Sequence, residues 1–272
     1  MTAEMVRTER RGKVLEVTFD RVPVNAINRE ASRAIYRAFR ALQDDPGLTV
    51  GLLLSGRERV FSAGWDLKEV AKRGFDLEGD NDPETGHGPG GFAGLTEFWD
   101  LLKPVVAAVN GAAIGGGFEL ALSCDIIVAS ADSYFALPEM QRGFLADAGA
   151  TQRLPRRVPY HVAVEMLLTG RRMEAEEALR WGLVNKIVPR EELVPTARAI
   201  AQDLSKGAPL AMQGLKQLLL RIESMPLREA MAKVKPGNSG DMPTYEAMMR
   251  SEDALEGPRA FVEKREPRWK GR

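Results

Sequence analysis

The chain has 272 residues, of which 44% are hydrophobic, and this composition is typical of a globular protein with a substantial core. Lys plus Arg and Asp plus Glu number 38 each, so the formal net charge is zero and the chain lacks the basic character of most nucleic-acid-binding proteins. A single cysteine, Cys124, excludes intrachain disulfides and metal sites built from several cysteines. We expect Cys124 to be a small buried thiol and the two histidines, His87 and His161, to be solvated. The sequence has neither a signal peptide nor an apolar run of membrane-spanning length, and we expect a soluble cytoplasmic protein.

Strand-like and helix-like segments alternate in the first half of the chain. Residues 14–19 alternate with a period of two, which is typical of a strand. Asn28 is suited to cap a helix over residues 29 to about 42, because apolar residues recur there on one face. Short apolar runs typical of buried strands follow at residues 50–54, 105–109 and 126–129. This alternation predicts an α/β fold.

The second half is predicted to be mostly helical. The acidic, Gly- and Pro-containing segment 76–91 is expected to be a mobile loop or lid. Further along the chain, we expect a strand at residues 184–188, an N-capped helix that starts at Ser251, and helices at residues 174–180, 191–205 and 208–222. We therefore divide the chain into a core over residues 1–200 and a C-terminal helical region over residues 201–272.

Two glutamates and a glycine-rich turn carry the chemistry. Glu119 ends the run Gly-Gly-Gly-Phe-Glu at residues 115–119, Glu139 follows Phe-Ala-Leu-Pro, and residues 61–66 form a third element upstream. A glycine-rich turn that opens a helix presents backbone N–H groups to a developing anion. Two carboxyl groups can supply one general acid and one general base. Together these elements predict a site that polarises a carbonyl and moves protons beside it.

These motifs resemble the crotonase superfamily, also called the enoyl-CoA hydratase/isomerase family, across nearly the whole chain. The matching segments are residues 25–27, 61–66, 110–111, 115–119, 124–125, 138–139, 151–154, 169–170 and 178–184. Residues 63–68, 88–97 and 263–272 are similar to the carnitinyl-CoA dehydratase subfamily in particular. The resemblance implies a spiral of ββα units and a C-terminal helical region that mediates trimerisation, often as a dimer of trimers. It also implies neither a metal nor a redox cofactor, since CoA enters as part of the substrate.

The resemblance assigns roles to four residues. The backbone N–H groups of Trp65 and Gly116 are expected to hold the thioester oxygen, and one such donor is typically worth about 3–4 kcal/mol. The alternative is that glycines 115–117 only permit close packing. Glu119 is expected to act as the base toward water at the β-carbon and Glu139 to deliver the proton to the α-carbon, with dehydration as the reverse. Surface glutamates at helix starts are the alternative for each carboxylate.

Further positions are expected by the same resemblance to contact CoA or the acyl group. The CoA-binding set comprises Val24, Ala26, Ala63, Asp66, Leu67, Lys68 and Gly115, with Phe261 and Lys264 reaching the site of a neighbouring subunit. Lys68 could instead be solvated, Phe261 a packing residue and Lys264 merely exposed. Quaternary ammonium groups bind aromatic faces, and the local candidates are Trp65, Phe92 and Trp99, with Glu97 or Asp100 as counter-charge. Trp99 is also a candidate core residue.

One turn departs from the family pattern. After the second glutamate the family usually has Gly-x-x-Pro and then a glycine pair, but Ala146 and Ala150 replace the proline and one glycine here. The N–H at Asp147 is expected to help hold the catalytic water, so a shifted turn would change substrate choice more than reaction type.

Several functions remain open at this point. The carnitinyl-CoA dehydratase reaction is the first choice, and a generic short-chain enoyl-CoA hydratase is the second. An enoyl-CoA isomerase that runs on one carboxylate is the third. Two alternatives belong to other classes: an RNA-binding family member with residual hydratase activity, and a non-catalytic CoA-binding scaffold that keeps the fold without turnover.

Overall fold

The computed structural model describes residues 5–74, 76–235 and 237–272, and the main sheet of this part of the chain is six-stranded. Its order is β1 (Val6–Arg11), β2 (Val14–Phe19), β4 (Val50–Ser55), β7 (Val105–Val109), β9 (Ile126–Ser130) and β12 (Lys186–Val188). The β1–β2 hairpin is antiparallel and every other pair is parallel. The central β7 is buried at every position, as expected for a continuous apolar run in a parallel sheet.

A second, four-stranded sheet has the order β11 (Arg172–Glu174), β10 (Tyr134–Ala136), β8 (Ala112–Ile114) and β5 (Val60–Ser62), and β3 (Ala26–Ile27) pairs with β6 (Gly64–Trp65). The chain passes from the first sheet to the second three times, through β4–β5, β7–β8 and β9–β10. Successive turns therefore stack as parallel neighbours in both sheets. This arrangement confirms the expected α/β spiral.

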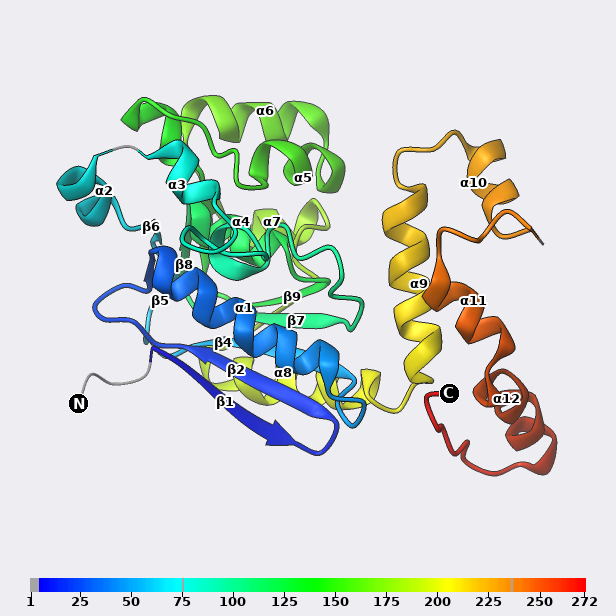
Figure 1. The fold of residues 1–272 in the computed structure, drawn as a ribbon. Helices are drawn as coiled ribbons and strands as arrows, with labels where there is room; N and C mark the ends of the chain where they lie inside the picture. The colour runs from blue at the N-terminus through cyan, green and yellow to red at the C-terminus, as the bar shows by residue number, and fades with distance from the viewer. Residues whose placement is uncertain (1–4, 75, 236) are drawn as a thin grey trace.

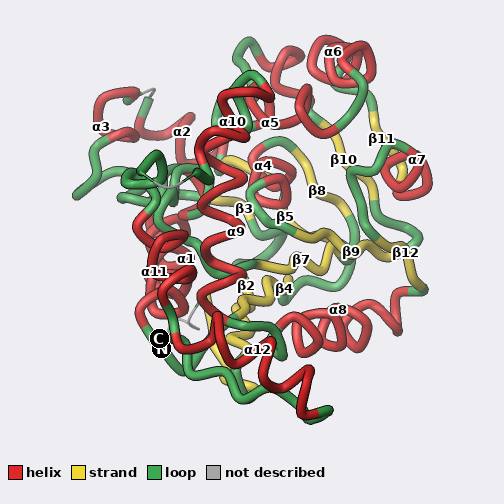
Figure 2. Tube along the Cα trace, turned by 90° about the vertical axis from the view of Figure 1, so that its right-hand side faces the viewer, coloured by secondary structure: helices red, strands yellow, loops and turns green. Residues whose placement is uncertain are grey.

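Helices cover the turns of this spiral (Figures 1 and 2). They are α1 (Arg29–Asp44), α2 (Leu67–Arg73), α3 (Leu77–Asn81), α4 (Gly116–Leu122), α5 (Ala150–Arg157), α6 (Tyr160–Thr169), α7 (Ala175–Arg180) and α8 (Arg190–Leu204), with short 3-10 turns η1 (Phe92–Gly94) and η2 (Pro138–Arg142). Helix α1 begins as predicted, because the Asn28 side chain accepts the Ala31 N–H at 2.9 Å. None of the described helices is both long and apolar enough to cross a membrane.

The C-terminal helices stand to one side of the spiral (Figure 1). They are α9 (Pro209–Ile222), α10 (Leu227–Lys233), α11 (Pro243–Arg250) and α12 (Glu252–Glu263), and we call residues 209–263 the C-terminal arm. The predicted cap of α12 is present, with the Ser251 hydroxyl accepting the Ala254 N–H at 3.1 Å. Helix α11 lies against α9, and Trp269 returns toward the core by donating to the Lys206 carbonyl at 2.7 Å.

Four sequence-based expectations were wrong. His87 is buried rather than solvated, because its ring is hydrogen-bonded to Ser32, whereas His161 is exposed as expected. Segment 76–91 is not simply a loop, since it includes α3 and is held by ion pairs from Arg29 to its acidic residues. Trp99 is 63% exposed and does not belong to the core. Cys124 is only partly buried.

Candidate active site

Parallel pairing of β8 with β10 brings the two predicted glutamates to one end of the second sheet. Ile114 pairs with Ala136, and the Gly115 N–H donates to the Ala136 carbonyl at 2.8 Å. The chain then turns into α4 on one side and into η2 on the other. A Cβ atom on Gly115 would lie 2.3 Å from Glu139 Oε1. The Glu139 carboxyl therefore lies directly against the glycine-rich turn, and any side chain at residue 115 would displace it.

The other wall of the turn is formed by β6. A Cβ atom on Gly64, whose φ is +80°, would lie 2.8 Å from the Gly116 nitrogen, so the two backbones are in close contact. Trp65 follows directly and pairs with Ile27. The two backbone positions predicted to form the oxyanion hole are thus on adjacent segments. Packing is also part of the explanation for the glycines, since a Cβ on Gly117 would lie 2.2 Å from the Ser62 carbonyl oxygen.

Glu119 is 3% exposed on the first turns of α4. Burial raises its pKa to about 8, an effect opposed by the Ala150 N–H and increased by the Glu139 and Asp147 carboxylates. The Ala150 N–H donates to Glu119 Oε1 at 3.0 Å. Alanine in place of glycine at residue 150 therefore does not prevent the hydrogen bond from the residue 150 N–H to Glu119. The added methyl group is fully buried.

Glu139 is 7% exposed at the start of η2. Burial is the largest cause that raises its pKa, and Asp147 adds to the rise while Arg142 opposes it. Its Oε2 atom is buried without a hydrogen-bond partner among the described residues. A carboxyl oxygen in that state is suited to meet a proton or a hydroxyl group of a bound molecule. The charge of Asp147 raises the pKa of both glutamates. The turn that differs from the family pattern, residues 146–150, therefore lies near both of them.

A cavity of about 100 Å³ lies at this point. It is lined by Ala63, Trp65, Leu67, Ile114, Gly115, Pro138, Glu139, Arg142 and Phe144. Five of the predicted site residues are thus brought together. The rings of Trp65 and Phe144 meet edge to face with centroids 5.8 Å apart, so Trp65 has an aromatic neighbour that sequence analysis did not identify.

Other predicted CoA-binding residues lie next to this cavity. The Ala63 N–H donates to the Val24 carbonyl at 3.0 Å, and Ala26 pairs with Gly64. Asp66 caps α2 and pairs with Arg21 at 2.7 Å. Burial raises the pKa of the Asp66 carboxyl, but the hydrogen bonds from the Arg21 side chain and the Glu69 backbone N–H outweigh burial, and the pKa is lowered overall. Its carboxylate therefore has a structural role.

Four predicted positions outside the cavity lining have exposed side chains. Lys68 lies in the first turn of α2 and Asp147 in the turn before α5. Phe261 is 85% exposed near the end of α12, and Lys264 ends that helix with φ of +53°. Figure 1 shows α12 well away from α4 and β6, so a single chain does not bring Phe261 and Lys264 to the cavity.

Arg153 of α5 is a further charged residue near Glu119 that sequence analysis missed. Its guanidinium donates to the Thr96 carbonyl at 2.5 Å and lies 5.8 Å from the centre of the Trp99 ring. Its positive charge lowers the pKa of Glu119. Arg153 belongs to the matching segment 151–154, but no local pattern indicated that its half-buried side chain would lie near a carboxyl group.

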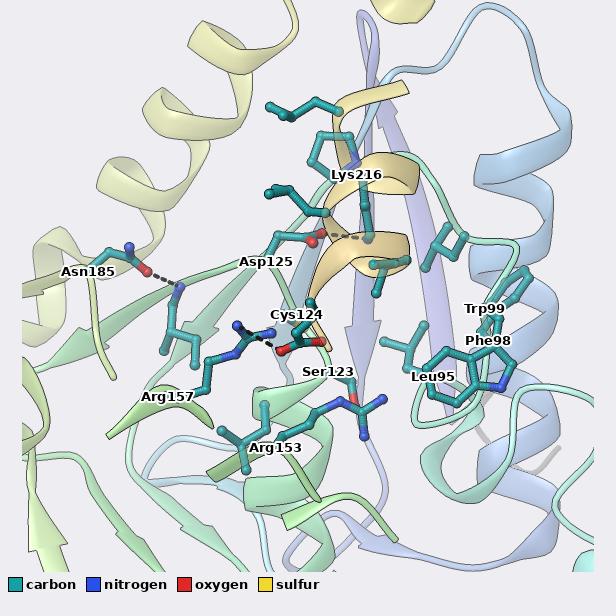
Figure 3. A pocket seen from close by; sticks show the side chains of 18 of the residues that line it. Leu95, Phe98, Trp99, Ser123, Cys124, Asp125, Arg153, Arg157, Asn185 and Lys216 are labelled. Atoms are coloured by element: carbon teal, nitrogen blue, oxygen red, sulfur yellow. Dashed lines mark hydrogen bonds and ion pairs between the residues drawn. The ribbon is translucent and has the colours of Figure 1, made fainter. Parts of the chain in front are cut away.

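A larger cavity of about 580 Å³ lies between α9 and the spiral (Figure 3). Its walls are mainly apolar, with Lys216 paired to Asp125 at 2.7 Å and Arg153 at one end. It contains neither of the two glutamates. Of the two glutamates, Glu139 lines the smaller cavity and Glu119 lines neither cavity.

Comparison with known proteins places the chain in a family. Residues 9–272 match the model of the enoyl-CoA hydratase/isomerase family. Carnitinyl-CoA dehydratases of Salmonella paratyphi A and Salmonella heidelberg are each 49% identical over 270 residues, which is 99% of this chain and 100% of theirs.

Solved structures agree with this result. An enoyl-CoA hydratase from Mycobacterium tuberculosis H37Rv has a TM-score of 0.86 at 36% identity, covering 98% of this chain and 99% of its own. An enoyl-CoA hydratase from Bacillus anthracis has a TM-score of 0.85 at 29% identity, covering 99% of this chain and 100% of its own. The chain belongs to the enoyl-CoA hydratase/isomerase family, the crotonase superfamily.

Proposed function

We propose that this protein catalyses the reversible interconversion of carnitinyl-CoA and crotonobetainyl-CoA, a hydro-lyase reaction. The observation that carries the proposal is the pair of buried carboxyl groups, Glu119 and Glu139, at one glycine-rich turn, each with a raised pKa. The 49% identity to carnitinyl-CoA dehydratases over nearly the full chain supports the acyl group. Hydration changes no oxidation state overall, so the reaction requires no redox cofactor.

The raised pKa of Glu119 suits the dehydration direction. Glu119, with a pKa of about 8, holds a proton at neutral pH and can deliver it to the departing β-hydroxyl group. Glu139, the more exposed of the two carboxyls, is the proposed base, and in its ionised form it removes the α-proton. Hydration needs the opposite protonation of both groups. The two carboxyls share one proton through the cycle, and their titration belongs to the pair.

The thioester oxygen becomes negative as the α-proton leaves. In the proposed site the N–H groups of Trp65 and Gly116 bind that oxygen, and Gly64 keeps the two backbones in contact. The loops of Val24, Ala26, Ala63, Leu67 and Lys68 bind CoA, and the Asp147 N–H holds water. The Trp65 and Phe144 rings are the proposed neighbours of the trimethylammonium group.

The test is loss of the ultraviolet absorbance of the conjugated enoyl thioester, with crotonobetainyl-CoA and crotonyl-CoA compared. We expect faster loss with crotonobetainyl-CoA, abolished by Glu139→Gln and unchanged by the control Glu176→Gln, whose side chain is exposed on α7. Preference for crotonyl-CoA would assign the protein to the generic hydratases. Thioester binding without turnover would instead indicate a scaffold, and a salt-dependent gel shift with RNA would indicate an RNA-binding member.

We also propose that residues 201–272 form an oligomerisation region that assembles a homotrimer or a hexamer. Exposed apolar side chains on α9, α10 and α12 support this proposal: Leu215, Leu219, Leu220, Leu227, Met231, Phe261 and Val262. Leu219→Glu is expected to yield monomers by light scattering, whereas Leu168→Glu on α6 of the core is the matched control. Dissociation by the control alone would contradict the assignment. A cytoplasmic location stays a prediction.

A further inference from the structure

A buried polar cluster lies outside the glutamate pair. Ser32 of α1, Asp80 of α3 and His87 of the following turn are all buried. Ser32 Oγ lies 2.8 Å from His87 Nδ1, and His87 Nε2 lies 3.7 Å from Asp80 Oδ1. The Ser–His–Asp sequence of contacts resembles a hydrolytic triad. Ser32 is fully buried, however, and its oxygen already accepts a backbone N–H, so no substrate can reach the hydroxyl.

Ser32 is hydrogen-bonded on two sides, to the backbone of Ala93 and to the ring of His87. The Ala93 N–H donates to Ser32 Oγ at 3.0 Å. His87 Nε2 faces the Asp80 carboxylate, which favours the neutral tautomer with its proton on Nε2, and in that tautomer Nδ1 accepts the Ser32 hydroxyl proton. Ser32 therefore connects α1, the His87 turn and η1 through two hydrogen bonds.

The backbone of η1 is held in an unfavourable conformation at this contact. Ala93 has φ of +55° and ψ of 11°, although alanine has no special preference for the left-handed region. Such a residue is strained and persists where its surroundings hold it in place. Next to it, a Cβ on Gly94 would lie 2.3 Å from the Ser32 carbonyl oxygen, so η1 is seated tightly on α1.

Phe92 connects this cluster to the proposed oxyanion site. Its ring centroid lies 5.0 Å from that of His87. On the other side, a Cβ on Gly116 would lie 2.4 Å from Phe92 Cε1 and 2.5 Å from Cζ. The ring thus covers the α-carbon of Gly116 directly.

We propose that the Ser32–His87 hydrogen bond is a positioning device for the thioester site: it seats η1 on α1 and so holds the Phe92 ring against Gly116, which fixes the direction of the Gly116 N–H. This inference rests on the proposed function, in which that N–H binds the thioester oxygen. Small errors in the direction of such a donor reduce its value in the transition state.

Burial, assisted by nearby arginines, keeps the His87 ring neutral. Burial lowers the pKa of His87 to about 4, with Asp80 opposing and Arg29, Arg73 and Arg33 adding to the decrease. Asp80 is itself paired with Arg29 at 2.8 Å and Arg73 at 2.6 Å, so its charge is already compensated. Nδ1 therefore remains an acceptor for Ser32 at neutral pH.

Substitutions at His87 test the device. His87→Leu keeps bulk but removes the acceptor, whereas His87→Asn keeps an acceptor close to the Nδ1 position. We expect His87→Leu to lower kcat about tenfold with KM changed less than about twofold, and His87→Asn to restore most of kcat. His161→Leu, at the exposed histidine, is the control and should be silent.

A spectroscopic probe separates positioning from folding. Bound acetoacetyl-CoA ionises to an enolate that absorbs in the near ultraviolet, and its enolate fraction reports the strength of the oxyanion donors. We expect this fraction to fall in His87→Leu and in Ser32→Ala, and no further in the double variant. If His87→Leu does not fold, Ser32→Ala supplies the same readout.

The two proposals fail in different ways. If wild-type protein neither turns over enoyl thioesters nor forms the enolate, the proposed function is wrong. If wild-type protein does both, and folded His87→Leu or Ser32→Ala retains the wild-type kcat and enolate spectrum, the positioning inference is overturned.

Discussion

The spiral core and the C-terminal arm use their apolar residues in opposite ways. In the core, every residue of β7 is buried, and the side chains of Glu119 and Glu139 are buried as well. In the arm, α10 and α11 have no buried residue, and Leu227 and Phe261 are among the most exposed large apolar side chains of the described residues. The core therefore buries most of its apolar side chains within one chain, although a few such as Trp99 and Leu168 are exposed, whereas α10 and α11 of the arm bury none.

This difference shows where single-chain reasoning about function is sufficient. The glutamates, the glycine-rich turn and the small cavity come from contacts between β6, β8, β10, α4 and α5 of one chain. Phe261 and Lys264 have no such contacts with the site. If they contribute to catalysis, they do so in the assembly.

The largest expected effect concerns the core. Glu119→Gln removes the proton that the proposed dehydration delivers, and we expect kcat to fall about a thousandfold. The secondary structure by circular dichroism should be unchanged, because the amide is isosteric and its oxygen can still accept the Ala150 N–H. Double-bond isomerisation that survived the substitution would identify an isomerase instead.

Matched glycine substitutions compare the packing of the two regions. A methyl group at Gly117 would meet the Ser62 carbonyl oxygen at 2.2 Å, and we expect Gly117→Ala to cost about 3 kcal/mol of unfolding free energy. In α12, the methyl group of Gly257→Ala would meet only the Trp269 ring at 3.4 Å. Helix propensity should make that change neutral or stabilising by about 0.5–1 kcal/mol. Chemical denaturation measures both, and equal costs would contradict the comparison.

The raised pKa of Glu119 makes the core sensitive to alkaline pH. The folded protein binds this proton more tightly than the unfolded chain, so stability falls as pH rises from about 4.5 to about 8 and the loss is complete above that. Glu119→Gln should remove this dependence and gain on the order of 3 kcal/mol over wild type at pH 9. Thermal melts at pH 6 and pH 9 measure the gain, and parallel pH dependences would show that Glu119 titrates normally.

The same proton sets the alkaline limb of the dehydration rate. Activity requires protonated Glu119, so kcat/KM should decline above about pH 8. Removing the nearby positive charge with Arg153→Met should move this decline to higher pH, because Arg153 lowers the pKa of Glu119. A decline that moved to lower pH would contradict the assignment of the limb to Glu119.

The smallest expected effect concerns the arm. Phe261→Ala should leave the unfolding free energy of the monomer unchanged within about 0.5 kcal/mol, since the ring is exposed. If the ring reaches the CoA site of a neighbouring subunit, KM for the thioester should rise several-fold while kcat is retained. An unchanged KM in an intact oligomer would restrict Phe261 to packing.

Much of this protein could be predicted from local sequence. The period-two pattern of β2, the apolar runs of β4, β7 and β9, and the caps Asn28 and Ser251 all express short-range rules, and the structure confirms them. The glycine run and the two glutamates indicated the reaction class, because a glycine-rich turn suits a developing anion and two carboxyl groups suit acid–base chemistry. The Ala150 and Ala146 departures were also visible, although their consequence was not.

Tertiary structure decided the rest, because electrostatic environment depends on neighbours distant in the chain. The pKa of Glu119 depends on burial by the spiral and on the Ala150 N–H, 31 residues away. His87 was predicted to be solvated because its own segment is polar, yet Ser32, 55 residues earlier, buries and binds it. Local sequence specifies which chemical groups are available, whereas the long-range pairing of β8 with β10 and of α1 with η1 determines which of them meet and in what charge state.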